Sequence, residues 1–81
     1  MKARIIVTLK ESVLDPQGQA IEGALAALGF AGVASVRQGK IIDIELNDPA
    51  DAQARLEAMC EKLLANTVIE DYRVEMVSEN R

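Results

Sequence analysis

Leu14-Asp15-Pro16-Gln17-Gly18-Gln19-Ala20 stands between a segment with strand periodicity and a segment with helical periodicity. Asp15 suits a helix N-cap, because its carboxylate can accept hydrogen bonds from the free N–H groups of the first turn. Pro16 fits the first helical position, where its missing N–H costs nothing. Gly18 needs another explanation, because glycine lowers helix propensity by about 1 kcal/mol relative to alanine. We therefore expect a close approach to the backbone at Gly18, and this junction is the first candidate contact surface.

The segments on both sides of this junction have clear periodicities. Residues 3–10 alternate between apolar and mixed positions, which is typical of a half-buried strand. After the junction, a helix is predicted from Pro16 to Leu28, and Gly29 supplies the glycine that commonly follows a helix end. The apolar residues of this helix recur at helical spacing, and they are Ile21, Ala24, Leu25 and Leu28.

The middle of the chain has the pattern of a hairpin. Residues 33–38 and 41–46 are extended segments, and Gln38-Gly39-Lys40 between them is a short glycine-containing connection. Asp48-Pro49 then repeats the pattern of Asp15-Pro16, an N-cap residue followed by a proline at the first helical position. A second helix is therefore expected to start there and to end near Ala65, with Asn66 as its cap. Its apolar stripe consists of Ala52, Leu56, Met59 and Leu63.

The last segment, residues 68–77, is predicted to be a strand with Tyr72, Val74 and Met76 on one face, and residues 78–81 are expected to be a polar, frayed end. The order βαββαβ predicts one α+β domain over residues 1–81. The expected architecture is ferredoxin-like, a split βαβ fold with a four-stranded antiparallel sheet and two helices on one face. The other face would carry Ile6, Thr8, Lys10 and Val77, and this apolar content favours cover by another copy of the chain.

Composition excludes several classes of function. Nine basic and thirteen acidic residues give a net charge of −4, and Phe30 and Tyr72 are the only aromatic residues, so a nucleic-acid binder is not expected. There is no apolar run near 18 residues and no signal-peptide pattern, so we expect neither a membrane span nor export. Cys60 is the single cysteine and cannot form an internal disulfide, which favours a reducing cytoplasm.

Catalytic signatures are missing from the sequence. There is no histidine, which removes the commonest general base and zinc ligand. Cys60 has no cysteine partner for a metal site, and the Gly29 to Gly32 stretch ends a helix instead of opening one. We therefore expect no catalytic, cofactor-binding or metal-binding residues in this chain. Arg37, Gly39 and Lys40 form a basic hairpin tip, either a solvated turn or a docking point, and Tyr72 is either a core residue or a partner contact.

The sequence nevertheless resembles a known family over almost its whole length. The resemblance is carried by three blocks: Leu14-Asp15-Pro16-Gln17-Gly18, Val36-Arg37-Gln38-Gly39-Lys40, and Asn66-Thr67-Val68-Ile69-Glu70-Asp71-Tyr72. Together these blocks are similar to PurS, the small subunit of bacterial phosphoribosylformylglycinamidine synthase. The resemblance implies a single PurS-like domain without catalytic residues of its own.

The same resemblance implies partners and a role. It implies that the chain bridges a large ATP-dependent synthase subunit, PurL, and a glutaminase subunit, PurQ, supports ammonia transfer, and forms a dimer or tetramer when alone. ATP and magnesium are implied on the large subunit and not on this chain. The implied partner-contact residues are Lys10, Asp15, Pro16, Gly18, Arg37, Gly39 and Lys40, and Tyr72 joins them as a candidate. For Asp15, Gly18 and Gly39 a purely local role in caps and turns stays open.

Two other functions are compatible with a ferredoxin-like fold. The first is a regulatory module that binds an amino acid or small anion between paired domains. The second is a small phosphatase with an arginine in a phosphate cradle and an asparagine that orients water. Arg37 on a hairpin and the absence of an early glycine-rich loop disfavour the phosphatase.

Overall fold

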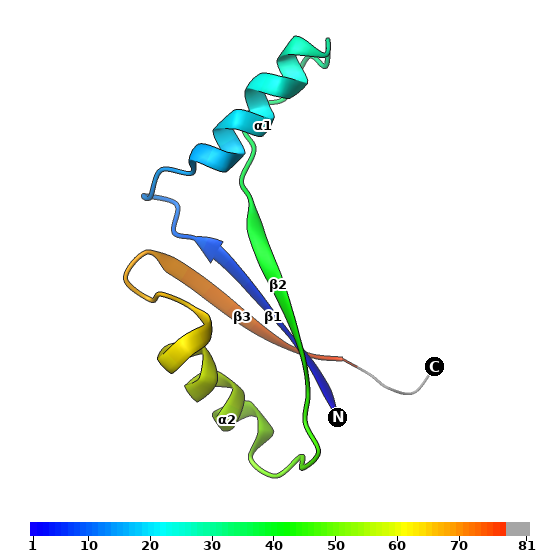
Figure 1. Ribbon diagram of the computed structural model, residues 1–81, viewed down its shortest axis with the longest axis vertical. Helices are drawn as coiled ribbons and strands as arrows, with labels where there is room; N and C mark the ends of the chain where they lie inside the picture. The colour runs from blue at the N-terminus through cyan, green and yellow to red at the C-terminus, as the bar shows by residue number, and fades with distance from the viewer. Residues whose placement is uncertain (78–81) are drawn as a thin grey trace.

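The computed structural model describes residues 1–77 (Figure 1), and the polar end predicted for residues 78–81 lies outside the described residues. The elements follow in the order β1 (Lys2–Leu9), α1 (Pro16–Ala27), β2 (Gly39–Glu45), α2 (Ala52–Met59), the π-helix η1 (Cys60–Leu64) and β3 (Glu70–Val77). The three strands form one antiparallel sheet in the order β2-β1-β3. The α+β class predicted from the sequence is confirmed.

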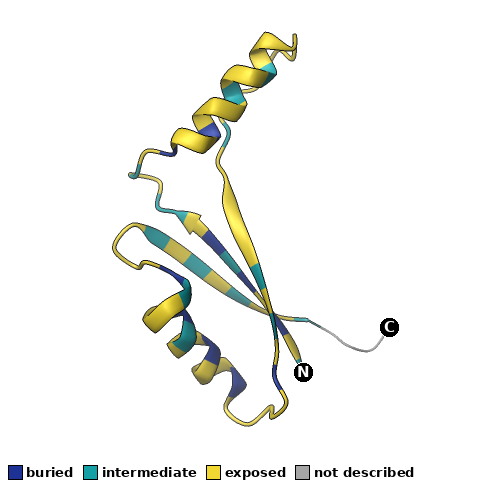
Figure 2. Ribbon diagram, in the orientation of Figure 1, coloured by how far each residue is buried: buried dark blue, intermediate teal, exposed yellow. Residues whose placement is uncertain are grey.

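The core lies between the sheet and the α2–η1 helix. Three residues of β1 are buried under this helix, namely Ala3, Ile5 and Val7, and they meet Ala52, Leu56 and Cys60 in one apolar cluster (Figure 2). The register places Ile5 opposite Ile42 of β2 and Val74 of β3. The alternation predicted for these strands is therefore correct, because the partly buried apolar residues of β2 and β3 pack on the same cluster.

The second helix starts later than predicted. The Asp48 carboxylate accepts a hydrogen bond from the N–H of Ala50 at 2.9 Å, so it closes a short turn instead of capping a helix. The N-cap of α2 is Asp51, which has a positive φ of 52° and no side-chain capping bond. Arg55 holds the preceding turn, because its Nη1 donates to the carbonyl oxygens of Asp48 and Ala50.

The predicted stripe of the second helix is correct as far as Met59 and then breaks. Its last member, Leu63, is 81 % exposed, whereas Leu64 is half-buried. The cause is the π-helix η1, in which the N–H of Ala65 bonds to the carbonyl oxygen of Cys60 at 3.0 Å. A π-turn holds more residues than an α-turn, so the side chains beyond Cys60 are rotated relative to the stripe.

Residues 1–77 form three strands where the sequence predicts four, and the hairpin predicted over residues 33–46 is absent from them. Residues 33–38 pair with no strand, and Gly39 and Lys40 are the first residues of β2, opposite Thr8 and Val7. The backbone N–H of Gln38 does not close a turn, because it donates to the Asp15 carboxylate at 2.8 Å. The chain therefore runs straight from this anchor into β2.

The first helix does not cover the sheet. In Figure 1, α1 projects beyond the end of the sheet, and the following segment returns alongside it; we call residues 11–38 the arm. The arm extends the molecule to 49 × 34 × 14 Å with a radius of gyration of 16.1 Å. A globular chain of this length would have a radius of gyration of about 12 Å. The prediction of two helices on one face of the sheet is therefore wrong for the single chain.

The outer face of the sheet is more polar than predicted. It carries Ile6, Thr8 and Val77, as expected, but Arg4 and Asp43 form an ion pair across it at 2.8 Å. This hydrogen-bonded ion pair holds the pKa of the Asp43 carboxyl below its usual value. Lys10 is not part of this face, because β1 ends at Leu9.

Candidate protein-contact site

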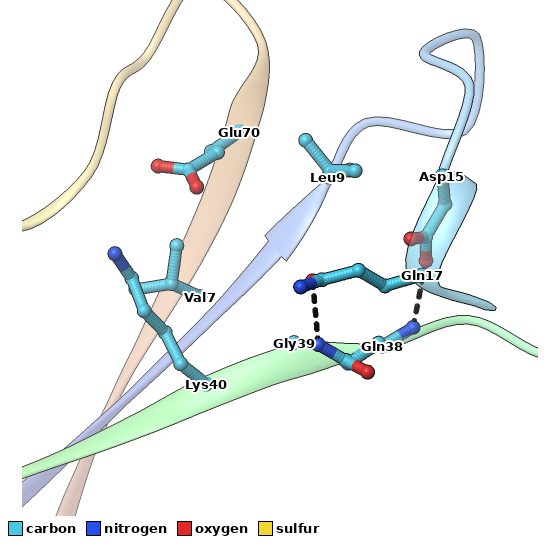
Figure 3. A pocket seen from close by; sticks show the side chains of 8 residues that line it. All are labelled: Val7, Leu9, Asp15, Gln17, Gln38, Gly39, Lys40 and Glu70. Atoms are coloured by element: carbon cyan, nitrogen blue, oxygen red, sulfur yellow. Dashed lines mark hydrogen bonds between the residues drawn. The ribbon is translucent and has the colours of Figure 1, made fainter. Parts of the chain in front are cut away.

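The candidate site lies where the arm joins the sheet. Four parts of the chain meet there: the end of β1, the start of α1, the residues that lead into β2, and the start of β3 (Figure 3). They enclose an open hollow of about 300 Å³. Two groups of residues that the sequence placed at separate positions, one around Asp15 and one around Arg37, are thus brought together.

Asp15 is the central polar residue of this junction. Its side chain is buried, with only 4 % of the residue exposed. One carboxylate oxygen accepts from the N–H of Gly18 at 2.9 Å, as an N-cap does, and the other accepts from the N–H of Gln38 at 2.8 Å. These two bonds, that of Gln38 first, hold the pKa of the Asp15 carboxyl below its usual value. Asp15 therefore caps α1 and ties the arm's returning segment to it.

Gly18 is where the two sides of the arm come closest. A Cβ atom at this position would overlap the carbonyl oxygen of Val36 and would lie 2.7 Å from a carboxylate oxygen of Asp15. The close approach predicted at Gly18 is therefore present, and it is made by the chain itself. Pro16 occupies the start of α1, as predicted.

Arg37 fastens the loop after β1. Its guanidinium donates three hydrogen bonds, to the backbone carbonyl oxygens of Leu9 (3.3 Å), Lys10 (2.8 Å) and Val13 (3.3 Å). Leu9 is the last residue of β1 and has no partner in β2, and Lys10 and Val13 lie beyond the strand, so the Arg37 guanidinium satisfies carbonyl groups that the β1–β2 ladder does not reach. The basic hairpin tip predicted at Arg37 is therefore wrong, and Arg37 holds the shape of the loop instead.

Gly39 and Lys40 lie at the start of β2. A Cβ at Gly39 would lie 2.5 Å from the carbonyl oxygen of Val7, so glycine permits the tight pairing of β2 with β1. Lys40 lies opposite Val7 at the edge of the hollow and is exposed. Lys10 is on the other side of β1, where its Nζ pairs with Asp71 of β3 at 3.1 Å.

Tyr72 lies in a neighbouring hollow of about 320 Å³ that Lys10 also lines. Its ring packs against the core, and its hydroxyl donates to a carboxylate oxygen of Glu61 at 2.8 Å. This hydrogen bond, with the negative charge of Glu61, raises the pKa of Tyr72 to about 12. Tyr72 therefore joins β3 to η1.

Three residues of the junction, Gln17, Gln38 and Glu70, are not among the contact residues predicted from the sequence. The side-chain amide of Gln38 donates to the amide oxygen of Gln17 at 2.6 Å, next to the Asp15 bond (Figure 3). Pairing between residues 21 positions apart has no local sequence signature, although Gln17 lies in the stretch that marks the junction. Glu70 also lines the hollow and accepts from the N–H of Asn66 at 2.7 Å.

The polar side chains of this junction serve to shape the protein surface. The Asp15 carboxylate and the Arg37 guanidinium are both bonded to backbone groups of the same chain. Within residues 1–77, no group of three or more histidine, cysteine or acidic side chains is arranged to hold a metal ion. In the same residues, no helix is both long and apolar enough to cross a membrane.

Comparison with known proteins identifies the family. The family model for PurS, phosphoribosylformylglycinamidine (FGAM) synthase, matches residues 2–78. A Synechocystis relative, phosphoribosylformylglycinamidine synthase subunit PurS, is 51 % identical over 77 residues, which cover 93 % of this chain and 77 % of the relative. The solved structure of Bacillus subtilis PurS superposes with a TM-score of 0.84 at 49 % identity, covering 91 % of this chain and 94 % of that one. A chain in the PurLQS structure from Thermotoga maritima has a TM-score of 0.77 at 34 % identity, covering 91 % and 93 %. The chain therefore belongs to the PurS family of phosphoribosylformylglycinamidine synthase subunits.

Proposed function

We propose that this chain is the small, non-catalytic subunit of phosphoribosylformylglycinamidine synthase in de novo purine biosynthesis. It bridges the large subunit PurL and the glutaminase subunit PurQ. PurQ releases ammonia from glutamine, and PurL uses ATP to join this ammonia to formylglycinamide ribonucleotide. The likeness to a chain of the Thermotoga maritima PurLQS structure supports this assignment.

The observation that carries the proposal is that the polar side chains at the junction form hydrogen bonds to other groups of the same chain. Asp15, Arg37 and Gln38 all form hydrogen bonds within the chain, so they hold the loop after β1 and the first turn of α1 in one shape. A preformed loop loses little conformational entropy when a partner binds. This arrangement suits a docking surface better than a reaction centre.

The candidate residues then divide into two kinds. Asp15, Pro16, Gly18, Arg37 and Gly39 shape the surface. Lys40 presents positive charge at its rim, where a partner's carboxylates can meet it. Lys10 lines the neighbouring hollow, and its ammonium group is paired with Asp71. Tyr72 braces the neighbouring strand against η1.

The nucleotide chemistry is placed on PurL. ATP and magnesium are bound there in this proposal, and this chain contributes no phosphate site. Its glycine pair Gly29 and Gly32 adopts positive φ at the tip of the arm, where Gly29 ends α1. A phosphate cradle requires a glycine-rich loop that opens a helix. The proposed location of the complex is the cytoplasm, in keeping with a single cysteine that is free and buried.

The isolated chain is proposed to self-associate as a dimer or tetramer. The support is the arm, which leaves Leu28 at 74 % exposure and gives one copy a radius of gyration well above that of a globular chain. In this proposal, a second copy completes the ferredoxin-like arrangement of four strands and two helices that the sequence predicts. Residues 1–81 remain a single PurS-like domain.

Reconstituted synthase activity tests the proposal. Purified PurL and PurQ are assayed with and without this protein, using glutamine in one series and ammonium chloride in another. Glutamine-dependent activity should require the protein, and ammonia-dependent activity should not, because free ammonia needs no bridge between subunits. Full glutamine-dependent activity without this protein, together with no co-elution, would overturn the proposal.

A further inference from the structure

The hollow at the junction has opposite charges on the two sides of an apolar floor. The floor is formed by Val7 and Leu9 of β1. Lys40 of β2 is paired with Val7, and Glu70 of β3 is paired with Leu9. Paired residues of antiparallel strands project from the same face of a sheet, so the two charged side chains stand on either side of this floor. Figure 3 shows the ends of both side chains beside Val7.

These two charges are not neutralised by ion pairs within residues 1–77. Lys40 and Glu70 line the same hollow, yet their charged groups form no ion pair with each other. The neighbouring hollow differs, because there Lys10 pairs with Asp71 at 3.1 Å. The Glu70 side chain is held in place, since one of its oxygens accepts from the N–H of Asn66 at 2.7 Å. A ligand that carries both a carboxylate and an ammonium group finds an opposite charge for each of them here.

A pair of side-chain amides lines a third side of the hollow. The amide nitrogen of Gln38 donates to the amide oxygen of Gln17 at 2.6 Å (Figure 3). This bond leaves the NH₂ group of Gln17 as a donor and the side-chain oxygen of Gln38 as an acceptor, and neither is bonded further in the part of the chain that the structure describes. A primary carboxamide offers one acceptor and one NH₂ donor, so it complements both groups at once.

Asp15 adds a negative charge behind the amide pair. Both oxygens of its buried carboxylate accept backbone N–H groups, and the carboxylate stays ionised with the positive charge of Arg37 beside it. A neutral side chain of the ligand is therefore favoured over an acidic one at this side of the hollow.

We propose that this hollow binds a free α-amino acid with a carboxamide side chain. The ligand carboxylate lies at Lys40, its ammonium group at Glu70, and its amide at the pair of Gln17 and Gln38. The hollow's volume of about 300 Å³ is at the lower end of the range for small-molecule sites, about 300 to 1,000 Å³, which suits an amino acid better than a nucleotide. Glutamine is the first member of this class to test, a choice that rests on the proposed function, because the synthase consumes glutamine.

Binding would link the arm to the sheet. The residues that meet the ligand belong to the first turn of α1, to β2 with the residue before it, and to the start of β3. A ligand that binds only the folded state stabilises that state. Glutamine would therefore tighten the junction that shapes the docking surface.

Isothermal titration calorimetry of the purified chain tests the site. Binding of L-glutamine should be saturable. L-glutamate has an acidic side chain in place of the amide, and glutaramate lacks the ammonium group, so each should bind at least about tenfold more weakly. Absence of saturable glutamine binding, or equal affinities for the three compounds, would overturn the proposal.

Matched substitutions locate the ligand. Lys40→Met removes the ammonium group and keeps a long side chain, and Glu70→Gln removes the charge and keeps an oxygen that can accept from the N–H of Asn66. Each should raise the dissociation constant for glutamine at least about tenfold. Lys2→Met is the control, because Lys2 is exposed at the far end of β1, and it should leave the constant unchanged. Equal affinities of Lys40→Met and Lys2→Met would place the ligand elsewhere and overturn the proposal.

Nuclear magnetic resonance separates this inference from the proposed function. In titrations with glutamine, the backbone amide signals of Gln38 and Gly39 should shift, whereas those of α2 should not. If PurL shifts these two signals and glutamine does not, the hollow takes a partner protein, which overturns the amino-acid site and leaves the bridging role standing. If glutamine binds here but the synthase does not need this chain, the amino-acid site stands and the proposed function fails.

Discussion

Replacing Gly18 by alanine sets helix propensity against steric overlap at the junction. Gly18 lies in the first turn of α1, and a helical Gly→Ala change stabilises a protein by about 0.5 to 1 kcal/mol where space allows. Gly23 is in the same helix, and an added methyl group there would have nothing within 4 Å, so Gly23→Ala measures the propensity gain alone. At Gly18 the added methyl group would overlap the Val36 carbonyl oxygen.

The steric cost exceeds the gain. Overpacking costs about 1 to 3 kcal/mol, and the obstacle here is backbone, which cannot rotate away as a side chain can. Moving the returning segment also pulls the N–H of Gln38 from the Asp15 carboxylate, and an unsatisfied backbone donor costs about 1 to 3 kcal/mol. After the propensity gain is subtracted, Gly18→Ala should lower the free energy of unfolding by about 1 to 5 kcal/mol.

Urea denaturation at one fixed protein concentration measures both variants, since self-association makes stability depend on concentration. Gly23→Ala should raise the midpoint, and Gly18→Ala should lower it. In thermal unfolding, Gly18→Ala should reduce Tm by at least about 4 °C for a domain of this size. If Gly18→Ala stabilises as much as Gly23→Ala, the returning segment does not lie against α1 as described.

Three further predictions concern the core, acid stability and the partner surface. Leu56→Ala should cost about 2 to 5 kcal/mol through a cavity in the core, and an unchanged melting temperature would contradict its full burial. The pKa of the Asp15 carboxyl is lower in the folded protein than in the unfolded chain, where it is about 4, so the ionised carboxylate stabilises the fold above that pH. This contribution is lost as the pH falls through the folded pKa. Asp15→Asn should therefore make the free energy of unfolding depend less on pH in the acid range. Lys40→Glu should weaken co-elution with PurL and PurQ without changing Tm. Lys2→Glu, at the far end of β1, is the control and should leave co-elution unchanged. Arg37→Glu should weaken co-elution and also lower Tm, because Arg37 holds the loop after β1.

The features that the sequence predicted correctly are those fixed by residues close together in the chain, such as helix ends and the faces of a strand. Asp15 and Pro16 mark the start of α1 because capping and proline geometry involve only the first helical turn. The end of α1 was also predictable, since Gly29 adopts a φ of 93° and Phe30 donates back to Leu25, as in a Schellman motif. Alternation placed Ala3, Ile5 and Val7 on the core face correctly, because it depends only on residues within one strand.

The junction was predicted in part, since its cap is local and its cross-chain bonds are not. The sequence marked Arg37 and Gly39 as important but placed them in a turn, because a glycine between two extended segments is typical of a hairpin. In the structure both residues serve distant backbone groups: Arg37 donates to Lys10, and Gly39 makes room for the carbonyl oxygen of Val7. A glycine that permits close approach and a glycine that permits a turn look the same in one sequence.

The first helix shows a further limit of periodicity. Ile21 and Leu28 have the spacing of a buried stripe, and this spacing predicts burial against the chain's own sheet when only one chain is considered. Periodicity reports that a helix face is selected for an apolar environment, but it carries no information on which chain provides that environment. The same stripe is compatible with a closed monomer and with an arm that packs on a second copy. Within residues 1–77, α1 lies beyond the end of the sheet, where the bonds of Asp15 and Arg37 hold the base of the arm, so the sheet of the same chain does not cover the stripe.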